Sequence, residues 1–318
     1  MIKKKLCILL IISLFLATVI GCIVKFYGTD NRPKVAVVLQ DLDSQYWNIV
    51  KAGAEKGLRE FDIDGRVVAP SFKSKKDVQE YVLKNVLKEH PDVLVVSPLQ
   101  SAAVKSILQK FIEHKIPVLL VDTDIPLEHK TAYIGTDNFE LGRKAGELLA
   151  SGLQPGDEVA LIAGEVISPV SGDRIKGATS SLKDAGIKIV ARKIDLPNEA
   201  LPARKAMTTI LEEHPDVKGV FATTDIMALN ALDAIKKQGN KMPVIGADGI
   251  IKMVESIEDG TLTGTVAQNP YDMGYISVET ALKVIKGEEV RKNIDTGVDL
   301  ITNDNVKQKL DFLKELLK

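Results

Sequence analysis

The stretch VAVVL at residues 35–39 decides the fold, because it returns 124 residues later as VALIA at residues 159–163. The stretch EHPDV at residues 89–93 returns with the same offset at residues 213–217. Short runs rich in Val, Ile and Leu, separated by segments of helical period, are typical of buried parallel strands in a βαβ series. The repeat therefore predicts two similar α/β lobes in one chain.

A third repeated stretch, KIPV at residues 115–118 and KMPV at residues 241–244, leads in each lobe to an acidic residue, Asp122 and Asp248. Open α/β sheets bind their ligands beyond the carboxyl ends of the strands. We therefore expect both acids at a ligand cleft between the lobes, although strand-end acids of this kind also serve as simple turn residues.

The predicted fold class is α/β, with two Rossmann-like lobes that are each a parallel sheet flanked by helices. A three-stranded hinge is expected to join the lobes, with the ligand cleft between them. The expected lobe limits are residues 34–136 plus 269–298 for the first lobe and residues 137–268 plus 299–318 for the second. Other expected elements are strands at 66–70 and 93–97 and helices at 77–88, 102–113, 139–151, 271–286 and 305–316.

The amino terminus has the pattern of an export signal. Residues 1–5 are basic, residues 6–20 form an apolar run without charge, and this run is short for a membrane span. The stretch VIGC at residues 19–22 resembles a bacterial lipobox, which predicts a signal peptide at residues 1–21, a lipidated Cys22 and a tether at residues 22–33. An uncleaved signal anchor with an incidental cysteine is the alternative. Lipid would anchor the folded part to a cell membrane in an extracytoplasmic location, either on an outer cell face or in a periplasm.

Charge and cysteine content exclude several functions. The chain has 42 Lys and Arg against 43 Asp and Glu, and loss of the predicted signal would remove three lysines and leave a net charge of −4. Such a chain offers no basic field for nucleic acid. Cys7 leaves with the signal and Cys22 carries lipid, so no thiol remains for a disulfide, a metal site or catalysis.

The histidines argue against an enzyme. His90, His114 and His214 precede expected strands and so belong at their amino ends, away from the cleft, and only His129 could approach it. The sequence shows no nucleophile–histidine–acid pattern, no metal-ligand spacing and no phosphate-binding glycine loop. We therefore expect no catalytic residue, no metal and no cofactor.

The residues expected around the cleft are typical of a carbohydrate site. Carboxylates and a guanidinium form charge-assisted hydrogen bonds to sugar hydroxyls, and aromatic rings pack on the apolar face of a sugar. Trp47 lies outside the apolar stripe of its helix, which favours the cleft, although packing beneath the next loop is the alternative. The set is Tyr46, Trp47, Asp122, Arg174, Thr223, Thr224, Asp225, Asp248 and Gln268.

Paired acids also suggest glycoside hydrolysis, which needs two carboxyl groups about 5–10 Å apart. One acid of the pair must then have a raised pKa. A neighbouring Arg174 favours the ionised form of Asp122 or Asp248 and so opposes that requirement. This argument favours binding over hydrolysis.

From about residue 33 to the carboxyl end, the chain resembles the sugar-binding proteins of bacterial ABC transporters, of the ribose and galactose type with the type 1 fold. The motifs that carry the resemblance are YIGTDN at 133–138 with Gly142 and Gly146, DR at 173–174 with Gly177, VFA at 220–222, DIMAL at 225–229, GADG at 246–249 and AQ at 267–268. The resemblance implies lobes that close on one monosaccharide. It implies Tyr46 and Trp47 as the aromatic pair, and as polar ligands Asp122, Arg174, Asp248 and Gln268.

The chain departs from the ribose-binding pattern at four expected ligand positions. Thr123 stands in place of arginine, Thr224 and Ser44 each in place of asparagine, and Asn198 in place of a stacking aromatic ring. Loss of one guanidinium and one ring would each cost an unchanged ligand about 1–3 kcal/mol. A hexose, another pentose, a polyol or a small furanone is therefore expected in place of ribose.

Fold alone does not decide the function. Repressors of the lactose type share the fold but begin with a DNA-binding helix-turn-helix, where this chain has a signal and a lipobox. We expect a monomer that delivers sugar to an ABC permease. The open alternative is a sensor that presents its closed form to a membrane histidine kinase or chemoreceptor.

Overall fold

The computed structural model describes residue 18, residues 32–70 and residues 75–317. The chain divides into two compact units, Met1–Pro33 and Lys34–Lys318. The predicted signal peptide and Cys22 lie outside the described residues, apart from residue 18, as does the tether up to residue 31. Among the described residues, no helix combines the length and the apolar character needed to cross a membrane.

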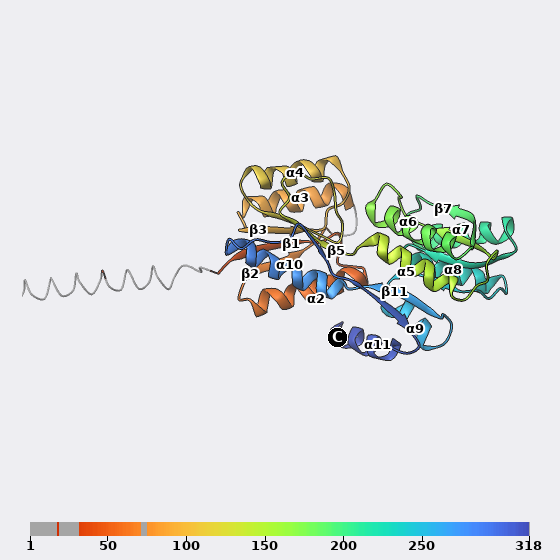
Figure 1. Cartoon of the computed structure of the whole chain (residues 1–318). Coiled ribbons are helices and arrows are strands. Elements are labelled where there is room, and N and C mark those ends of the chain that lie inside the picture. The colour runs from red at the N-terminus through yellow and green to blue at the C-terminus, as the bar shows by residue number, and fades with distance from the viewer. Residues whose placement is uncertain (1–17, 19–31, 71–74, 318) are drawn as a thin grey trace, which may run out of the picture. The chain divides into compact units, whose positions relative to one another are not determined.

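The first lobe is built on a six-stranded parallel sheet with the strand order β12-β5-β4-β3-β1-β2. Helices α2 and α10 cover one face of this sheet and α3 and α4 cover the other (Figure 1). Its strands are β1 (Lys34–Val38), β2 (Asp64–Val68), β3 (Val93–Val96), β4 (Val118–Val121), β5 (Ala132–Gly135) and β12 (Asn293–Asp295). Its helices are α2 (Gln45–Glu60), α3 (Lys75–Lys88), α4 (Ala102–Glu113) and α10 (Pro270–Ile285).

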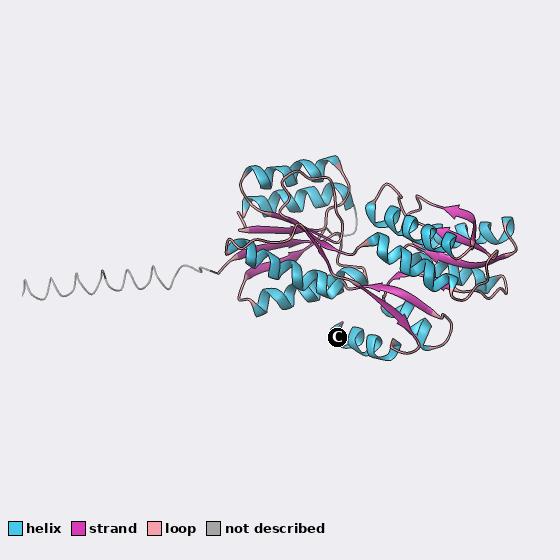
Figure 2. Ribbon diagram, in the orientation of Figure 1, coloured by secondary structure: helices cyan, strands magenta, loops and turns pink. Residues whose placement is uncertain are grey.

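The second lobe contains a four-stranded parallel sheet, β7-β6-β8-β9, and a three-stranded sheet, β10-β11-β13, in which β13 runs antiparallel to β11 (Figure 2). Its strands are β6 (Glu158–Ile162), β7 (Lys188–Lys193), β8 (Val217–Ala222), β9 (Val244–Ile245), β10 (Ala247–Asp248), β11 (Gly264–Gln268) and β13 (Val298–Thr302). Its helices are α5 (Asn138–Ala150), α6 (Pro169–Asp184), α7 (Ala200–Glu213), α8 (Asp225–Lys237), α9 (Ile251–Glu258) and α11 (Val306–Leu316).

The local sequence explains these elements. Strands β3 and β4 read VLVV and VLLV and are buried at every residue, as expected for parallel strands covered by helices on both faces. Helix α2 begins after Ser44, whose hydroxyl accepts a hydrogen bond from the backbone of Trp47. Strand β2 begins at Asp64, two residues before the predicted start.

The chain crosses between the lobes three times, after β5, after β11 and between β12 and β13. Hydrogen bonds tie the crossings together, since the backbone amide of Thr296 donates to the carbonyl of Gly135 at 2.8 Å and the side chain of Asn269 donates to the carbonyl of Thr296 at 3.1 Å. The predicted two-lobed α/β fold with a three-stranded hinge is confirmed. The exact lobe limits stay a prediction.

Two helix pairs come unusually close, one in each lobe. A Cβ at Gly274 would lie 2.0 Å from the carbonyl oxygen of Val50, between α10 and α2. A Cβ at Gly142 would lie 2.0 Å from the carbonyl oxygen of Arg174, between α5 and α6. Glycine is needed at both contacts because any side chain would push the helices apart. The second contact fixes α6, and therefore Arg174, relative to the rest of its lobe.

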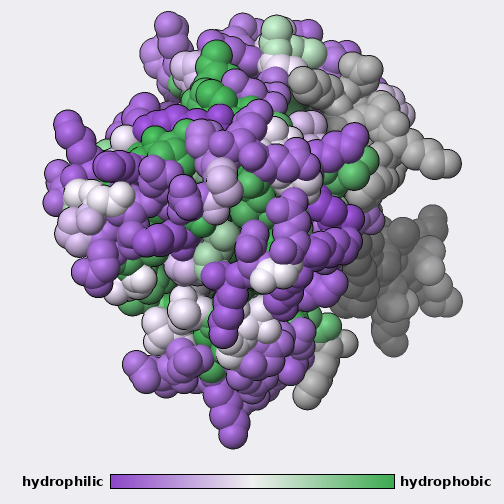
Figure 3. Space-filling view, turned by 90° about the vertical axis from the view of Figure 1, so that its right-hand side faces the viewer, coloured by the Kyte–Doolittle hydropathy of each residue, from purple (hydrophilic) through white to green (hydrophobic). Residues whose placement is uncertain are grey.

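The core consists of four buried clusters, one on each face of the sheet in each lobe. The surface seen from the end of the second lobe is mainly hydrophilic, with small hydrophobic patches between hydrophilic residues (Figure 3). The buried apolar side chains therefore lie between the sheets and their helices, and polar side chains lie at the strand ends.

Candidate functional site

Four of the predicted ligand residues lie at strand ends that lead to the boundary between the lobes. Asp122 follows β4, Thr224 follows β8, Asp248 ends β10 and Gln268 ends β11. Arg174 comes from α6 and is 1% exposed. The topology thus gathers residues that are far apart in the sequence, as expected where parallel strands end.

In the first lobe, Asp122 is held from both sides. The Tyr46 hydroxyl donates to one carboxylate oxygen at 2.5 Å, and the Thr123 hydroxyl donates to the other at 2.9 Å. Asp122 has a left-handed backbone with φ of 64°, and its amide donates to the carbonyl of Ile134 at 2.9 Å. Such a conformation is uncommon outside glycine and is often found at functional sites.

In the second lobe, Arg174 lies at the centre of a buried polar cluster. Its Nε donates to Asn138 Oδ1 at 2.9 Å, and its Nη1 donates to the carbonyl of Thr223 at 2.7 Å. Nη1 also lies 3.5 Å from Asp248 Oδ1. Nη2 is buried and has no hydrogen-bond partner within the described part of the chain. Arg174 therefore has one donor group free for a ligand.

Asp248 accepts hydrogen bonds at both carboxylate oxygens. The Gln268 side-chain amide donates to Oδ1 at 2.8 Å, and the backbone amide of Asp225 donates to Oδ2 at 3.1 Å. Asp248 keeps 14% of its side chain exposed. A carboxylate fixed in this way has lone pairs left for sugar hydroxyls.

The sequence predicts Asp225 at the cleft, and its hydrogen bonds show that it supports the site. Its side chain is fully buried, and Oδ2 accepts hydrogen bonds from the backbone amides of Gly249 and Ile250 at 2.7 and 2.8 Å. Oδ1 has no hydrogen-bond partner among the described residues. Asp225 thus holds the loop that follows Asp248.

Burial dominates the ionisation of these acids. It raises the pKa of Asp122, although the hydrogen bonds from Tyr46 and Thr123 act in the opposite direction. Burial also raises the pKa of Asp248 more than Arg174 lowers it. Arg174 lowers the pKa of both acids, as expected from its charge, but loss of solvent outweighs the guanidinium, so the pKa of each acid is raised on balance. The pKa of Tyr46 is raised by the same burial and by the charge of Asp122.

Asp225→Asn is expected to change how stability depends on pH. Burial and the charge of Asp248 raise the pKa of Asp225, so the folded state keeps a proton that the unfolded state loses near pH 3.9, the usual value for Asp. The free energy of unfolding then falls as pH rises from about 4 to the folded pKa. We expect urea unfolding between pH 4 and pH 8 to show that the free energy of unfolding of the wild type minus that of Asp225→Asn decreases as the pH rises.

The half-buried Asp233 on α8 provides the control for this titration. A hydrogen bond from Lys237 lowers the pKa of Asp233. The free energy of unfolding of the wild type minus that of Asp233→Asn should therefore rise with pH across the lower part of the range. A difference for Asp225→Asn that stays flat would contradict the raised pKa.

Trp47 does not lie outside the apolar stripe of α2, so that prediction is wrong. It is 7% exposed and belongs to the hydrophobic cluster of the first lobe. Its ring meets Tyr46 edge-on, with ring centroids 5.2 Å apart. Trp47 packs in the core beside Tyr46 and supports the tyrosine ring through this contact.

The remaining predicted residues serve partly as local supports. The Ser44 hydroxyl caps α2, and the Thr224 hydroxyl caps α8 and donates to Asn198 Oδ1 at 2.7 Å. Asn198 is exposed. His129, the one histidine that by its place in the sequence could approach the cleft, is exposed in the loop that leads to the amino end of β5.

The sequence missed two polar residues that matter at the site. Gln45 Oε1 accepts a hydrogen bond from the backbone amide of Ile251 at 2.7 Å, which joins α2 of the first lobe to α9 of the second. Gln40 donates to Thr123 Oγ1 at 3.0 Å and so supports the residue that holds Asp122. No sequence signal distinguishes such glutamines from surface ones, since both roles depend on contacts across the fold.

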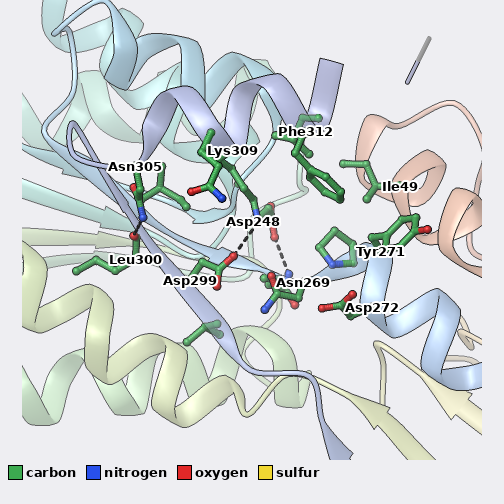
Figure 4. Close-up of a pocket in the computed structure, with 17 residues that line it drawn as sticks. Ile49, Asp248, Asn269, Tyr271, Asp272, Asp299, Leu300, Asn305, Lys309 and Phe312 are labelled. Carbon is green, nitrogen blue, oxygen red and sulfur yellow. Dashed lines mark hydrogen bonds and ion pairs between the residues drawn. The ribbon is translucent and has the colours of Figure 1, made fainter. Parts of the chain in front are cut away.

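A pocket of about 540 Å³ adjoins the site and shares Asp248 and Gln268 with it. Its walls come from both lobes, with Ile49 and Tyr271 on one side and residues of β13 and α11 on the other (Figure 4). Tyr271 and Phe312 meet edge-on at 5.8 Å, and Lys309 pairs with Asp299 at 2.9 Å. The size is in the usual range for small-molecule sites. No group of three or more His, Cys, Asp or Glu side chains within the described ranges is placed to hold a metal ion.

Comparison with known proteins gives a consistent result. The family model described as a periplasmic binding protein domain matches residues 35–289. The D-ribose/D-allose-binding protein of Pseudomonas aeruginosa is 28% identical over 289 residues, which cover 86% of this chain and 90% of that protein. The ribose import binding protein of Bacillus subtilis is 27% identical over 309 residues, covering 94% and 99%.

A solved structure agrees with these relatives. GanP, a glucose-galactose binding protein from Geobacillus stearothermophilus, superposes with a TM-score of 0.80 at 26% identity, covering 87% of this chain and 99% of that one. The match extends over both lobes, so the similarity concerns the whole fold.

Proposed function

Because the chain belongs to the periplasmic binding protein family, we propose that it is an extracytoplasmic solute-binding protein that closes on a monosaccharide or similar small polyol and delivers it to an ABC permease. The observation that carries this proposal is the buried Arg174 beside Asp248 and Gln268, with a guanidinium nitrogen left unpartnered in the described structure. Charged donors and acceptors fixed in advance bind hydroxyl groups well, because little ordering is left to be done on binding.

The proposed ligand contacts are divided between the lobes. Tyr46 and Asp122 belong to the first lobe, Arg174 belongs to the second, and Asp248 and Gln268 end strands of the three-stranded sheet. A sugar that contacts both sides binds the closed form better than an open one, and only that difference in affinity shifts the equilibrium between them. Closure would then tell the permease that the protein is loaded.

We propose that the sugar is not ribose, although both relatives described above are named for ribose. Thr123 hydrogen-bonds Asp122 and brings no second positive charge. Asn198 has no ring that could stack on a sugar. Its side chain is exposed and accepts a hydrogen bond from the Thr224 hydroxyl. These two departures support a hexose such as allose, glucose or galactose, which relatives and structural neighbours are named for binding.

Binding without turnover is the test of this function. We expect a screen of hexoses, pentoses and polyols to find one that raises the free energy of unfolding by about 2.7 kcal/mol at one hundred times its dissociation constant. Chromatography should return that sugar chemically unchanged. Turnover of a glycoside that disappears in Asp122→Asn would instead identify a hydrolase.

Delivery to a permease is preferred to sensing because the ribose relative from Bacillus subtilis is named for import. We propose a monomer with lobes at residues 34–136 plus 269–298 and 137–268 plus 299–318, and with no nucleic-acid partner. Loss of uptake of the cognate sugar after deletion of the gene, with unchanged signalling responses, is the expected result in cells.

We also propose that Cys22 carries lipid after cleavage of residues 1–21, on the strength of the VIGC stretch at residues 19–22. Cys22→Ser is expected to abolish incorporation of a fatty-acid analogue, and to leave a precursor or to release protein into the medium, because the acylated thiol is missing. Protein gels of labelled cells make the measurement. Equal labelling of wild type and Cys22→Ser would refute the anchor.

A further inference from the structure

The first crossing between the lobes carries a motif whose role the proposed function leaves unexplained. It reads Thr136-Asp137-Asn138 and joins the end of β5 to the start of α5. Asp137 caps α5, since its side chain accepts a hydrogen bond from the backbone of Glu140. Thr136 and Asn138 are 4% and 9% exposed. Buried polar side chains at a hinge need hydrogen-bond partners, and these partners are ligand residues.

The contacts form a closed ring. The Thr136 hydroxyl donates to Gln268 Oε1 at 2.9 Å, and Gln268 Nε2 donates to Asp248 Oδ1 at 2.8 Å. The Asn138 amide nitrogen donates to the carbonyl of Thr136 at 3.2 Å, and its Oδ1 accepts from Arg174. Arg174 Nη1, 3.5 Å from Asp248, completes the ring.

The ring has a chemical direction. A glutamine amide carries a donor and an acceptor on the same carbon, so its two orientations place opposite groups toward Asp248. The carboxylate of Asp248 only accepts, so it selects the orientation in which Nε2 faces it, and the Thr136 hydroxyl holds the opposite end of the amide by donating to Oε1. Without that donor, Oε1 is left without its buried partner and the amide is held against Asp248 at one end only.

We propose that Thr136 is a positioning residue for sugar binding, which acts by fixing the side-chain amide of Gln268 against Asp248. The inference rests on the proposed sugar site. It also makes the hinge part of the site, because the hydroxyl that orients Gln268 belongs to one crossing and Gln268 to another.

The test compares two substitutions of Thr136. Thr136→Val keeps the shape of the side chain but removes the donor, and it is expected to weaken binding of the cognate sugar about tenfold by isothermal titration calorimetry. Thr136→Ser keeps the donor and is expected to stay within about twofold of the wild type. Thr265→Val is the matched control, because Thr265 is also buried, on β11, and its hydroxyl has no partner in the described structure. Its affinity is expected to be unchanged.

A second background separates positioning from a general structural effect. If Thr136 acts through Gln268, Thr136→Val should cost less than about twofold in a Gln268→Leu protein. An equal loss of affinity in both backgrounds would overturn the proposal, as would full affinity in Thr136→Val.

Nuclear magnetic resonance of the sugar-free protein tests the same point without a ligand. The Gln268 side-chain amide signals, assigned by their absence in Gln268→Leu, are expected to shift or broaden in Thr136→Val and to be retained in Thr136→Ser. Unchanged signals would overturn the positioning role. A wild type that binds no sugar would refute the proposed function alone, since the amide signals still report where Gln268 is held.

Discussion

Asp248→Asn is expected to weaken sugar binding by about 2–5 kcal/mol, the usual cost of removing one partner of a buried, hydrogen-bonded charge pair. Arg174 is 1% exposed and would lose its nearest negative charge. The new amide would also place a donor against the Gln268 amide or against the backbone amide of Asp225, because both carboxylate oxygens accept in the wild type. The loss therefore has an electrostatic and a hydrogen-bonding part.

Calorimetry measures the affinity, and small-angle scattering measures the closure that should accompany binding. The wild type is expected to become more compact with sugar, and Asp248→Asn is expected to show no compaction at the same sugar concentration. Asp233→Asn is the control, since Asp233 is a half-buried acid on α8 that pairs with Arg204 and Lys237. Wild-type affinity in Asp248→Asn would remove Asp248 from the site, and tight binding without compaction would refute closure.

Gly142→Ala is expected to lower the free energy of unfolding by about 1–3 kcal/mol and to weaken sugar binding as well. Its Cβ would lie 2.0 Å from the carbonyl oxygen and 2.7 Å from the Cα of Arg174, both of which are backbone atoms. Helices α5 and α6 must then move apart, at the cost typical of an overpacked core. Because Arg174 lies on α6 and Asn138 on α5, their hydrogen bond is strained by the same movement.

Gly152→Ala serves as the matched control for this substitution. Gly152 follows α5, and the nearest atom to its added Cβ would be the Leu149 carbonyl oxygen at 3.9 Å, an ordinary contact. Urea unfolding is expected to show little change for Gly152→Ala and a clear loss for Gly142→Ala. A Gly142→Ala protein with the stability and affinity of the wild type would mean that the helix pair tolerates a wider spacing.

The sequence alone determined the architecture, because the signals for architecture are local or periodic. Runs such as VLVV at β3 are buried on both faces, and the runs that repeat 124 residues apart predict two lobes by themselves. The strand-end positions of Asp122 and Asp248 are also predictable, since each depends on an apolar run only a few residues away.

Side-chain direction and ionisation are less predictable. The helical pattern places Trp47 outside the apolar stripe of α2, but its side chain packs in the hydrophobic cluster of the first lobe, because that packing depends on where the first turn of α2 meets the sheet. The charge of Arg174 predicts a lowered pKa for its acidic neighbours, but the extent of burial reverses the net effect. Neither burial nor solvent exposure is a property of a short stretch of sequence.

Only the tertiary structure decided which polar groups support one another. Thr136 meets Gln268 across 132 residues, Arg174 meets Asn138 across 36, and Gln45 meets the backbone of Ile251 across 206. The sequence identifies most members of these pairs as polar residues near strand or helix ends. It does not determine the pairs, because a hydrogen bond requires two groups to approach within about 3 Å, and that approach is set by the packing of helices and the crossing of the hinge strands.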